Sequence, residues 1–235
     1  MKASIGKNTV TMKNSIARAA QNLGLTEKRI ITLGMSKLDA RQKKTVYKNE
    51  KNRTITITAA EYQTIAKLKY KLNAYQELKE GTEKIGKKQL TIKKETLRGK
   101  TITRINWLEQ AKYNQGKGKI TICFTTKIMP YLCGIENRFT SYRINDAKKL
   151  KSIYAFRLME YLISWSNKKD GQRTISIEEI KEMLEIPTSY KTGGTTAKII
   201  NPAIKELEKK GWKIHYEKEK TGRKISHLTF TWRKP

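Results

Sequence analysis

One arrangement of residues occurs twice in this chain, and it limits the possible folds more than any other feature. A short run in which hydroxyl residues alternate with isoleucine begins at Thr54 and again at Thr174. Each run leads into a hydroxyl residue that stands three positions before a glutamate. The two pairs are Thr58 with Glu61 and Ser176 with Glu179. In such a capping box the hydroxyl accepts from the amide three residues on, while the carboxylate accepts from the amide of the cap residue. The sequence therefore predicts two strands that each lead directly into a capped helix.

The residues after each capping box repeat as well. A second helical stretch with an apolar stripe follows the capped helix, and then a stretch of period-two alternation interrupted by turn residues. The expected helices are 59–67 and 72–85 in the first copy, and 177–184 and 195–210 in the second. The expected hairpins pair 100–113 with 117–125, and 212–216 with 225–232. We therefore predict an α+β fold of two tandem winged-helix domains, each a helix-turn-helix with a β-hairpin wing.

The chain is long enough for two separate hydrophobic cores. Its 235 residues hold two domains of about 100–130 residues each. The passage that follows Cys133 is the expected boundary, which gives an N-terminal domain of residues 1–134 and a C-terminal domain of residues 135–235. Further helices are expected at 15–22, 26–40, 126–133 and 146–167.

The charge of the chain points to a polyanionic partner. It has 51 lysine and arginine residues against 21 aspartate and glutamate residues, a formal net charge of +30. A nucleic acid would relieve this self-repulsion, because phosphates neutralised by Lys and Arg release their counterions. No apolar run approaches the roughly 18–20 residues of a membrane-spanning helix, and the N-terminus has no signal pattern. We expect a cytoplasmic protein with no membrane partner.

The sequence offers little for metal binding or catalysis. Its two cysteines and two histidines lack the close spacing that zinc ligands need. The residues concerned are Cys123, Cys133, His215 and His227. Adjacent carboxylates at Glu178 and Glu179 fit the first turn of a helix, where negative charge meets the helix dipole. Gly193-Gly194 is not followed by the Gly-Lys-Ser/Thr of a phosphate-binding loop. We expect no metal, no cofactor, no catalytic residue and no enzymatic activity.

The candidate DNA-binding residues lie on the second helix of each pair and on the wings. In the second copy, the helical period turns short polar donors outward, opposite the stripe of Ala197, Ile200, Ile204 and Leu207. The candidates there are Lys191, Thr195, Thr196, Lys198, Asn201 and Lys205, with Lys218, Lys220, Arg223 and Lys224 around the wing tip. In the first copy they are Asn73, Gln76, Lys79 and Lys84, with Lys117 at the hairpin tip. Asn201 also has a purely structural interpretation as a local kink before Pro202.

Several of these segments, taken together, resemble the iteron-binding plasmid replication initiators of Rep superfamily 3. The segments that follow the second domain of that family in order and approximate spacing are 138–143, 153–165, 173–180, 186–191, 201–207 and 221–224. Residues 73–80 resemble a helix of the family's first domain. The loop from Lys191 to Thr196 departs from the pattern, since it is glycine-rich where a bulkier segment is expected.

The resemblance implies a specific function. It implies a bacterial, plasmid-associated protein that binds tandem origin repeats as a monomer, and opens an adjacent AT-rich tract with host replication initiator and helicase proteins. It also implies dimerisation through the first domain, with repression of the protein's own promoter by the dimer. Residues 195–205 would form the principal major-groove helix and residues 73–84 its counterpart in the first domain. Two alternatives remain open at this point: a winged-helix transcriptional regulator, and a basic structural RNA-binding protein.

Overall fold

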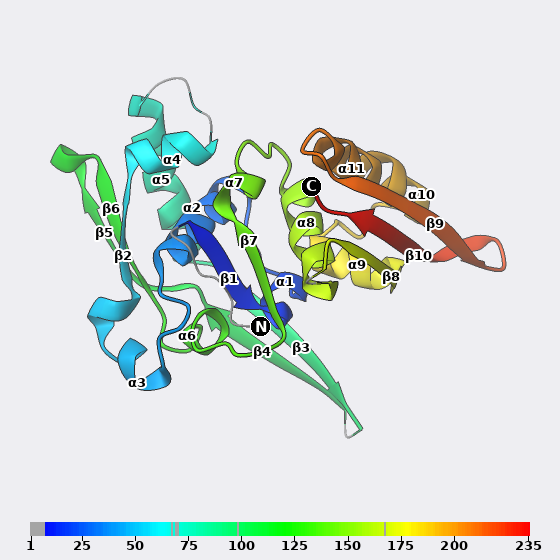
Figure 1. Cartoon of the computed structure of the whole chain (residues 1–235), viewed down its shortest axis with the longest axis horizontal. Coiled ribbons are helices and arrows are strands. Elements are labelled where there is room, and N and C mark those ends of the chain that lie inside the picture. Colours follow the sequence, from blue (N-terminus) through cyan, green and yellow to red (C-terminus); the bar gives the residue numbers. More distant parts are fainter. Residues whose placement is uncertain (1–7, 67, 69–70, 98, 167) are drawn as a thin grey trace. The chain divides into compact units, whose positions relative to one another are not determined.

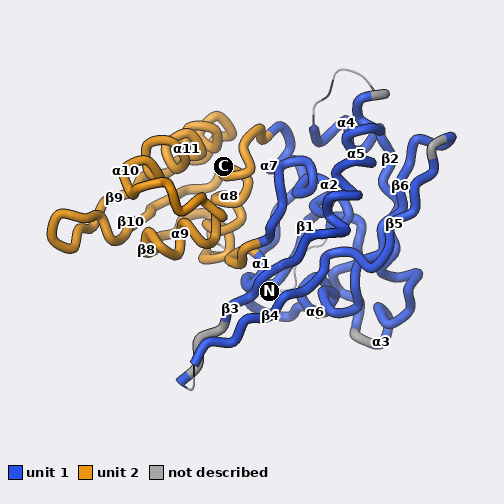
Figure 2. Tube along the Cα trace, turned by 180° about the vertical axis from the view of Figure 1, so that it is seen from behind, with its two compact units in different colours: residues 1–16, 21–149 blue, residues 17–20, 150–235 orange. Residues whose placement is uncertain are grey.

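The computed structural model describes residues 8–235 apart from 67, 69–70, 98 and 167. The chain divides into two compact units (Figures 1 and 2). The first contains the residues up to 16 together with 21–149, and the second contains 17–20 together with 150–235. The units are described in turn because each has its own sheet and its own buried core.

The first unit is built around a three-stranded antiparallel sheet. Its helices are α1 (Asn14–Arg18), α2 (Leu25–Lys37), α3 (Lys44–Tyr47), α4 (Ala59–Ala66), α5 (Lys71–Ile85), α6 (Met129–Leu132) and α7 (Ile144–Ala147), with short 3₁₀ turns η1 (Glu50–Arg53) and η2 (Gln115–Lys117). Its strands are β1 (Thr9–Lys13), β2 (Thr54–Thr58), β3 (Gln89–Thr96), β4 (Gly99–Asn106), β5 (Leu108–Asn114), β6 (Lys119–Phe124) and β7 (Phe139–Arg143). The sheet has the order β2-β6-β5, and α2, α4 and α5 pack against one another beside it. Residue Arg18, the end of α1, already belongs to the second unit.

The second unit repeats this plan with fewer additions. Its elements are α8 (Ile153–Trp165), β8 (Asp170–Ser176), α9 (Ile177–Leu184), α10 (Thr192–Thr195), the π-helical segment η3 (Thr196–Ile200), α11 (Asn201–Glu208), β9 (Lys213–Thr221) and β10 (Lys224–Arg233). Its sheet has the order β8-β10-β9. In both sheets the strand that precedes the helix pair (β2 or β8) pairs with the sheet's last strand in sequence (β6 or β10). That last strand also pairs with the remaining strand, β5 or β9. Two winged-helix units, as predicted, make up the chain.

The hairpin predicted in the first unit is correct on one side only. β5 and β6 pair around the expected tip, with Asn114 opposite Lys119. β4, however, pairs with β3 in a separate hairpin, so the expected continuous strand 100–113 is wrong. The break falls at Trp107, whose ring is fully buried and donates a hydrogen bond to the carbonyl of Gln21 (3.0 Å). Because the Trp107 side chain is buried, β4 ends at Asn106 and β5 begins at Leu108.

The boundary between the units also differs from the expected one after Gly134. β7 pairs with β1 in an antiparallel ladder that sets Thr11 opposite Ser141. This pairing keeps residues 139–143 in the first unit, and the division falls after Lys149 instead. The long helix expected at 146–167 is two helices, α7 and α8. Ser152 ends the gap between them, because its hydroxyl accepts from the amides of Tyr154 and Ala155 and so starts α8.

The two predicted capping boxes start their helices where expected, yet only the first is reciprocal. At α4, the Glu61 amide donates to the Thr58 hydroxyl (3.2 Å) and the Thr58 amide donates to the Glu61 carboxylate (2.8 Å). At α9, the Glu179 amide donates to the Ser176 hydroxyl (3.0 Å), but the Glu179 carboxylate accepts from the hydroxyl of Tyr161 instead (3.1 Å). The carboxylate of Glu179 therefore links α9 to α8.

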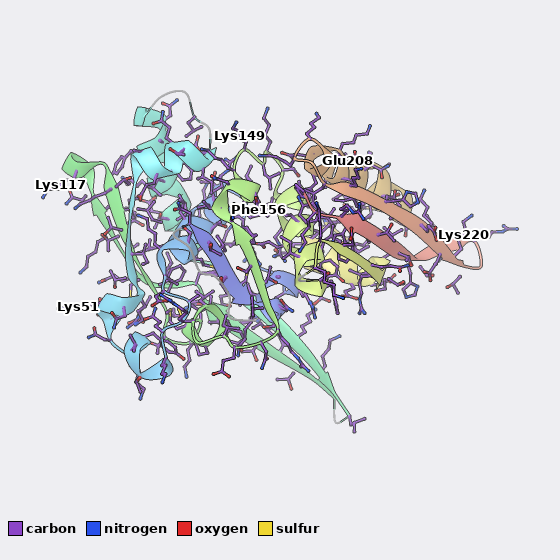
Figure 3. The ribbon with its side chains drawn as sticks, in the orientation of Figure 1. Lys51, Lys117, Lys149, Phe156, Glu208 and Lys220 are labelled. Carbon is purple, nitrogen blue, oxygen red and sulfur yellow. The ribbon has the colours of Figure 1, made fainter. Side chains whose placement is uncertain are left out.

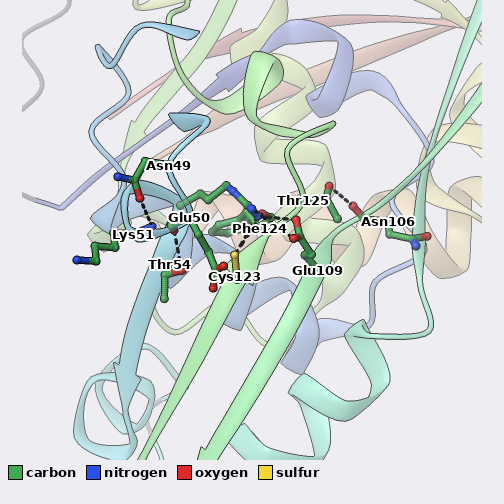
Figure 4. A network of polar contacts seen from close by, with 10 residues as sticks. Asn49, Glu50, Lys51, Thr54, Asn106, Glu109, Cys123, Phe124 and Thr125 are labelled. Carbon is green, nitrogen blue, oxygen red and sulfur yellow. Dashed lines mark hydrogen bonds and ion pairs between the residues drawn. The ribbon is translucent and has the colours of Figure 1, made fainter. Parts of the chain in front are cut away.

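In each unit, a buried arginine joins several elements. Arg53 donates to the carboxylate of Glu109 and to the carbonyl of Phe124 (2.7 Å), and its guanidinium lies 3.0 Å from the Cys123 sulfur (Figure 4). Arg157 donates to the carboxylate of Glu160 (3.3 Å) and to two backbone carbonyls. Those carbonyls belong to Ala19 and Met183. A buried guanidinium needs such partners, because an unpaired buried charge is strongly destabilising.

Candidate nucleic-acid interface

The helix expected to read the groove in the second unit contains a π-helical turn. Residues 192–208 form one helical stretch that passes from α10 through η3 into α11. Across η3 the amide of Asn201 donates to the carbonyl of Thr196, one residue further back than in an α-helix. Pro202 is the second residue of α11 and has no amide hydrogen to give. Because this turn contains one extra residue, the side chains before it are rotated about the helix axis relative to the side chains after it.

This shift corrects part of the predicted binding face. Thr195 and Thr196 are buried, with 0% and 4% of their surface exposed, while Ala197 is exposed. The Thr196 hydroxyl donates to the carbonyl of Gly193 (3.0 Å), and the Thr195 hydroxyl donates to that of Lys191 (3.3 Å). The expectation that Thr196 faces outward, and that Thr195 offers a donor to a ligand, is therefore wrong for this conformation.

Three of the predicted residues on the helix do share an exposed face. Lys198, Asn201 and Lys205 all have exposed side chains, and Lys191 is exposed just before the helix. The nearest acid in the sequence, Glu206, is turned away, since its carboxylate accepts from the amides of Lys151 and Ser152. This contact also fixes α11 against the start of α8. The face therefore offers two cations and one amide, and the exposed carboxylate of Glu208 lies beyond Lys205 at the end of α11.

The wing of the second unit carries the remaining cations. Lys218 and Lys220 lie on β9, and Arg223 and Lys224 lie at the turn, all exposed. Figure 3 shows Lys220 beside the tip of the β9–β10 hairpin. Glu219, the acid between the two lysines, accepts a hydrogen bond from the Thr229 hydroxyl on β10. The net charge of the wing is therefore positive, which suits contact with phosphates.

The strand at the base of this wing reaches the exposed face of the helix. Tyr216 on β9 donates from its hydroxyl to the side-chain oxygen of Asn201 (2.7 Å). Its ring packs against that of Phe230, with 5.6 Å between ring centroids. Burial raises the pKa of Tyr216 above its ordinary value of 10.0. The hydroxyl is therefore protonated, and able to donate, at neutral pH.

The corresponding helix of the first unit, α5, has a different surface. Asn73, Gln76 and Lys84 are exposed and Lys79 is partly exposed, as predicted. The Gln76 amide, however, donates to Glu80 on the same helix (2.6 Å). Glu83 adds another exposed carboxylate to this helix. At the wing of this unit, Lys117 is exposed beside the β5–β6 tip (Figure 3).

The cysteines behave as core residues. Cys123 and Cys133 are both free thiols and both buried. Burial raises the pKa of the Cys133 thiol to about 11, which keeps it neutral. Among the residues that the structure describes, no group of three or more His, Cys, Asp or Glu side chains is placed to hold a metal ion. No described helix is long and apolar enough to cross a membrane.

Two winged helices in tandem, each with a cationic wing, define the chain as a protein of the nucleic-acid-binding winged-helix class. Its family follows from two family models. "Initiator Replication protein, WH1" matches residues 9–163, and "Initiator Rep protein, WH2" matches residues 176–232. The chain belongs to this family of replication initiators, and the resemblance drawn from the sequence is confirmed.

Individual relatives agree with this assignment. The PI protein of Escherichia coli is 27% identical over 259 residues, covering 95% of this chain and 82% of that protein. An uncharacterized 27.6 kDa protein of Escherichia coli is 23% identical, covering 87% and 86%. The crystal structure of the Pi initiator protein in complex with iteron DNA matches with a TM-score of 0.81 at 23% identity, covering 97% and 98% of the two chains. Domains 2 and 3 of RctB match with a TM-score of 0.51 at 9% identity, covering 92% and 84%. These two structures share the fold of this chain.

Proposed function

We propose that this initiator binds tandem direct repeats in a plasmid origin as sequence-specific duplex DNA, with the second unit as the main reader of sequence. The observation that carries the proposal is the exposed face of Lys198, Asn201 and Lys205 beside a cationic wing. A helix in the major groove needs short donors that reach base edges, and a wing needs charge that reaches phosphates. The matched structure of the Pi initiator with iteron DNA supports the same mode of binding for this chain.

The first unit has a positioning role in this scheme. Its helix α5 offers Asn73, Lys79 and Lys84, and its wing offers Lys117, to the adjacent groove and backbone. Two modules on successive grooves supply enough contact to bend the DNA between them, and bending a site costs about 1–6 kcal/mol. The bend assists opening of an AT-rich tract, after which host replication initiator and helicase proteins join. Binding does this work, without catalysis by the chain itself, in the cytoplasm of a plasmid-bearing bacterium.

The first unit is also the proposed site of dimerisation, with the dimer acting as repressor of the protein's own promoter. The β3–β4 hairpin exposes Ile102 on its surface, with 52% of that residue accessible, and Leu97 at its turn. A two-stranded hairpin alone is marginally stable, so a second copy that covers these side chains would stabilise it. Ile102→Glu should shift the protein from dimer to monomer in sedimentation equilibrium, while Thr103→Glu, one position along the same strand, should not. Equal dimerisation of both variants would place the interface elsewhere.

The DNA-binding proposal is tested by selection of duplexes from a random pool, followed by binding at increasing salt. A direct-repeat motif should emerge, and its advantage over a scrambled duplex should persist as salt rises, because base contacts release fewer counterions than phosphate contacts. Equal, salt-sensitive binding to every duplex would contradict sequence reading. Tighter binding to folded RNA would favour a structural RNA-binding role instead. Direct repeats beside an AT-rich tract separate an initiator from a transcriptional regulator of the same fold.

A further inference from the structure

The exposed amide of Asn201 is held by a residue outside its own helix. Tyr216, on strand β9, donates its hydroxyl hydrogen to the Asn201 side-chain oxygen at 2.7 Å. The tyrosine is itself held in place, because its ring packs on Phe230, which lies opposite it on β10 and is buried. A side chain anchored at its ring can direct its hydroxyl to one point. The contact therefore restrains an otherwise exposed side chain on the candidate reading face.

The hydrogen bond leaves Asn201 with a defined chemistry toward a ligand. An asparagine amide has an oxygen that accepts and a nitrogen that donates two hydrogen bonds. The oxygen is engaged by Tyr216, and within the part of the chain that the structure describes the nitrogen has no protein partner. Asn201 therefore presents a donor. On a base edge in the major groove, guanine offers two adjacent acceptors, O6 and N7, and thymine offers O4. Adenine sets the N6 donor beside its N7 acceptor, so its bidentate contact uses both ends of the amide.

The same strand face also connects Asn201 to the cations of the wing. Side chains two positions apart point to the same side of a strand, so Tyr216 shares a face of β9 with Lys218 and Lys220. Both lysines are exposed. If these lysines bind the phosphate backbone, the wing would hold Tyr216 at a fixed distance from the DNA groove. The tyrosine thus lies between the part of the unit that contacts phosphates and the residue that contacts a base.

We infer that Tyr216 is a positioning residue that holds Asn201 with its amide nitrogen toward the DNA, so that Asn201 selects guanine or thymine at one position of the repeat. This inference rests on the proposed function, since it assigns base preference within the proposed DNA interface. Tyr216 itself touches no base. Its effect is confined to the orientation of Asn201, which distinguishes it from a residue that merely stabilises the wing.

The test is duplex selection with the full chain, four variants at Tyr216 and Asn201, and one control variant elsewhere. Tyr216→Phe removes the hydroxyl and keeps the ring on Phe230. Asn201→Ala removes the amide, and the double variant removes both groups. Asn201→Asp keeps an acceptor for Tyr216 but loses the donors. Tyr131→Phe, a half-buried tyrosine on α6 of the first unit, is the matched control. Urea unfolding of each variant separates altered reading from altered stability.

The wild-type chain should enrich guanine or thymine at one position of the selected repeat. Tyr216→Phe should lower that enrichment about 2- to 10-fold, the range of one hydrogen bond, at that position only. Tyr131→Phe should leave it unchanged. In the Asn201→Ala background, loss of the Tyr216 hydroxyl should have no further effect on base preference, because the residue it positions is gone. Asn201→Asp should lose the preference although its contact with Tyr216 remains.

Three results would overturn the inference. If the wild type enriches a repeat and Tyr216→Phe enriches the same one equally, Tyr216 does not position Asn201. If Tyr216→Phe weakens binding equally at all positions and in the Asn201→Ala background, the tyrosine acts on the wing and not on the amide. If the wild type selects no motif at all, the proposed function fails, and the inference fails with it.

Discussion

The two winged-helix units share one sheet order, yet the helices that we propose to face the DNA groove differ in how their polar side chains are used. On α5 of the first unit, Gln76 is paired with Glu80, and Glu77 accepts from the hydroxyl of Tyr62. On the corresponding helix of the second unit, Asn201 is paired with a tyrosine of the wing strand and keeps its donors free for a ligand. The same fold can therefore either satisfy its polar groups internally or present them.

The acids of the two helices show the same contrast. Glu80 and Glu83 are exposed on α5, where they would repel phosphates. In the second unit, Glu206 serves the start of α8. The carboxylate of Glu208 is exposed at the end of α11, beyond Lys205. We propose that the second unit reads bases and that the first positions the protein. The following predictions test that division, beginning with the largest expected effect.

Removing the buried arginine of each unit should break the fold of that unit. Arg157→Met removes a buried guanidinium that pairs with Glu160 and donates to two carbonyls, so we expect a loss of about 3–5 kcal/mol in the free energy of unfolding. Arg53→Met should cost less, because its partner Glu109 is half-exposed, with 49% of its side chain accessible. Urea unfolding followed by tryptophan fluorescence measures both, and Trp107→Phe removes the signal of the first unit. Equal losses of unfolding free energy in the two variants would contradict the expectation that Arg157 stabilises its unit more than Arg53 does.

Replacing the amide on each groove-facing helix should affect binding unequally. Asn201→Ala should weaken binding to the selected repeat by about 1–3 kcal/mol, as expected for loss of a specific base contact. Asn73→Ala, at the exposed start of α5, should cost less than about 0.5 kcal/mol if the first unit mainly positions the protein. Fluorescence anisotropy on the selected and scrambled duplexes gives both values. A larger loss for Asn73→Ala would reverse the proposed roles of the two units.

The wings should differ in the number of phosphates that they neutralise. Each lost phosphate contact lowers the slope of log affinity against log salt by about 0.9. Arg223→Ala combined with Lys224→Ala should therefore reduce the slope by about 1.8, and Lys117→Ala by about 0.9. A binding series between low and moderate salt measures these slopes. An unchanged slope for Lys117→Ala would show that the first wing does not contact the backbone.

The helix cap of the first unit should respond to acid. Partial burial works to raise the pKa of Glu61, but the hydrogen bonds from Lys37 and Thr58 outweigh it and hold the pKa below its ordinary value of 4.5. The stabilisation is thus present above that value and is lost as pH falls through the lower folded-state pKa. Glu61→Gln should flatten the acid limb of stability of the first unit. Thr58→Ala and Ser176→Ala should each cost about 1 kcal/mol at neutral pH.

Much of the fold could be predicted because its signals are local. The hydroxyl-to-glutamate spacing started α4 at Ala59 and α9 at Ile177, where the structure has them. The β1–β7 ladder could not be predicted, because its strands lie at distant points of the chain and Thr9–Lys13 is too short to show a clear alternation. The pairing of Glu179 with Tyr161 also depends on how α8 packs, which no local spacing records.

The candidate interface was predicted less completely than the fold, because one turn of the second unit's helix, Thr196–Ile200, is π-helical. A uniform helical period placed Thr196 outside and Ala197 inside, and the π-helical segment before Pro202 reversed them. A proline within a helical pattern is the signal that could have indicated a change of phase. The lysines of the wing needed no such detail, because a cation at a hairpin tip is exposed in any register.

The measurement that tests the central claim most directly is salt-titrated binding of the full chain to a selected duplex and to its scrambled control. The chain is compared with two double variants, Lys198→Ala with Asn201→Ala, and Asn73→Ala with Lys79→Ala. We predict that the first double variant loses discrimination between the two duplexes, while the second weakens binding to both and keeps the discrimination. Loss of discrimination in the second double variant alone would contradict the account, since the first unit would then be the reader of sequence.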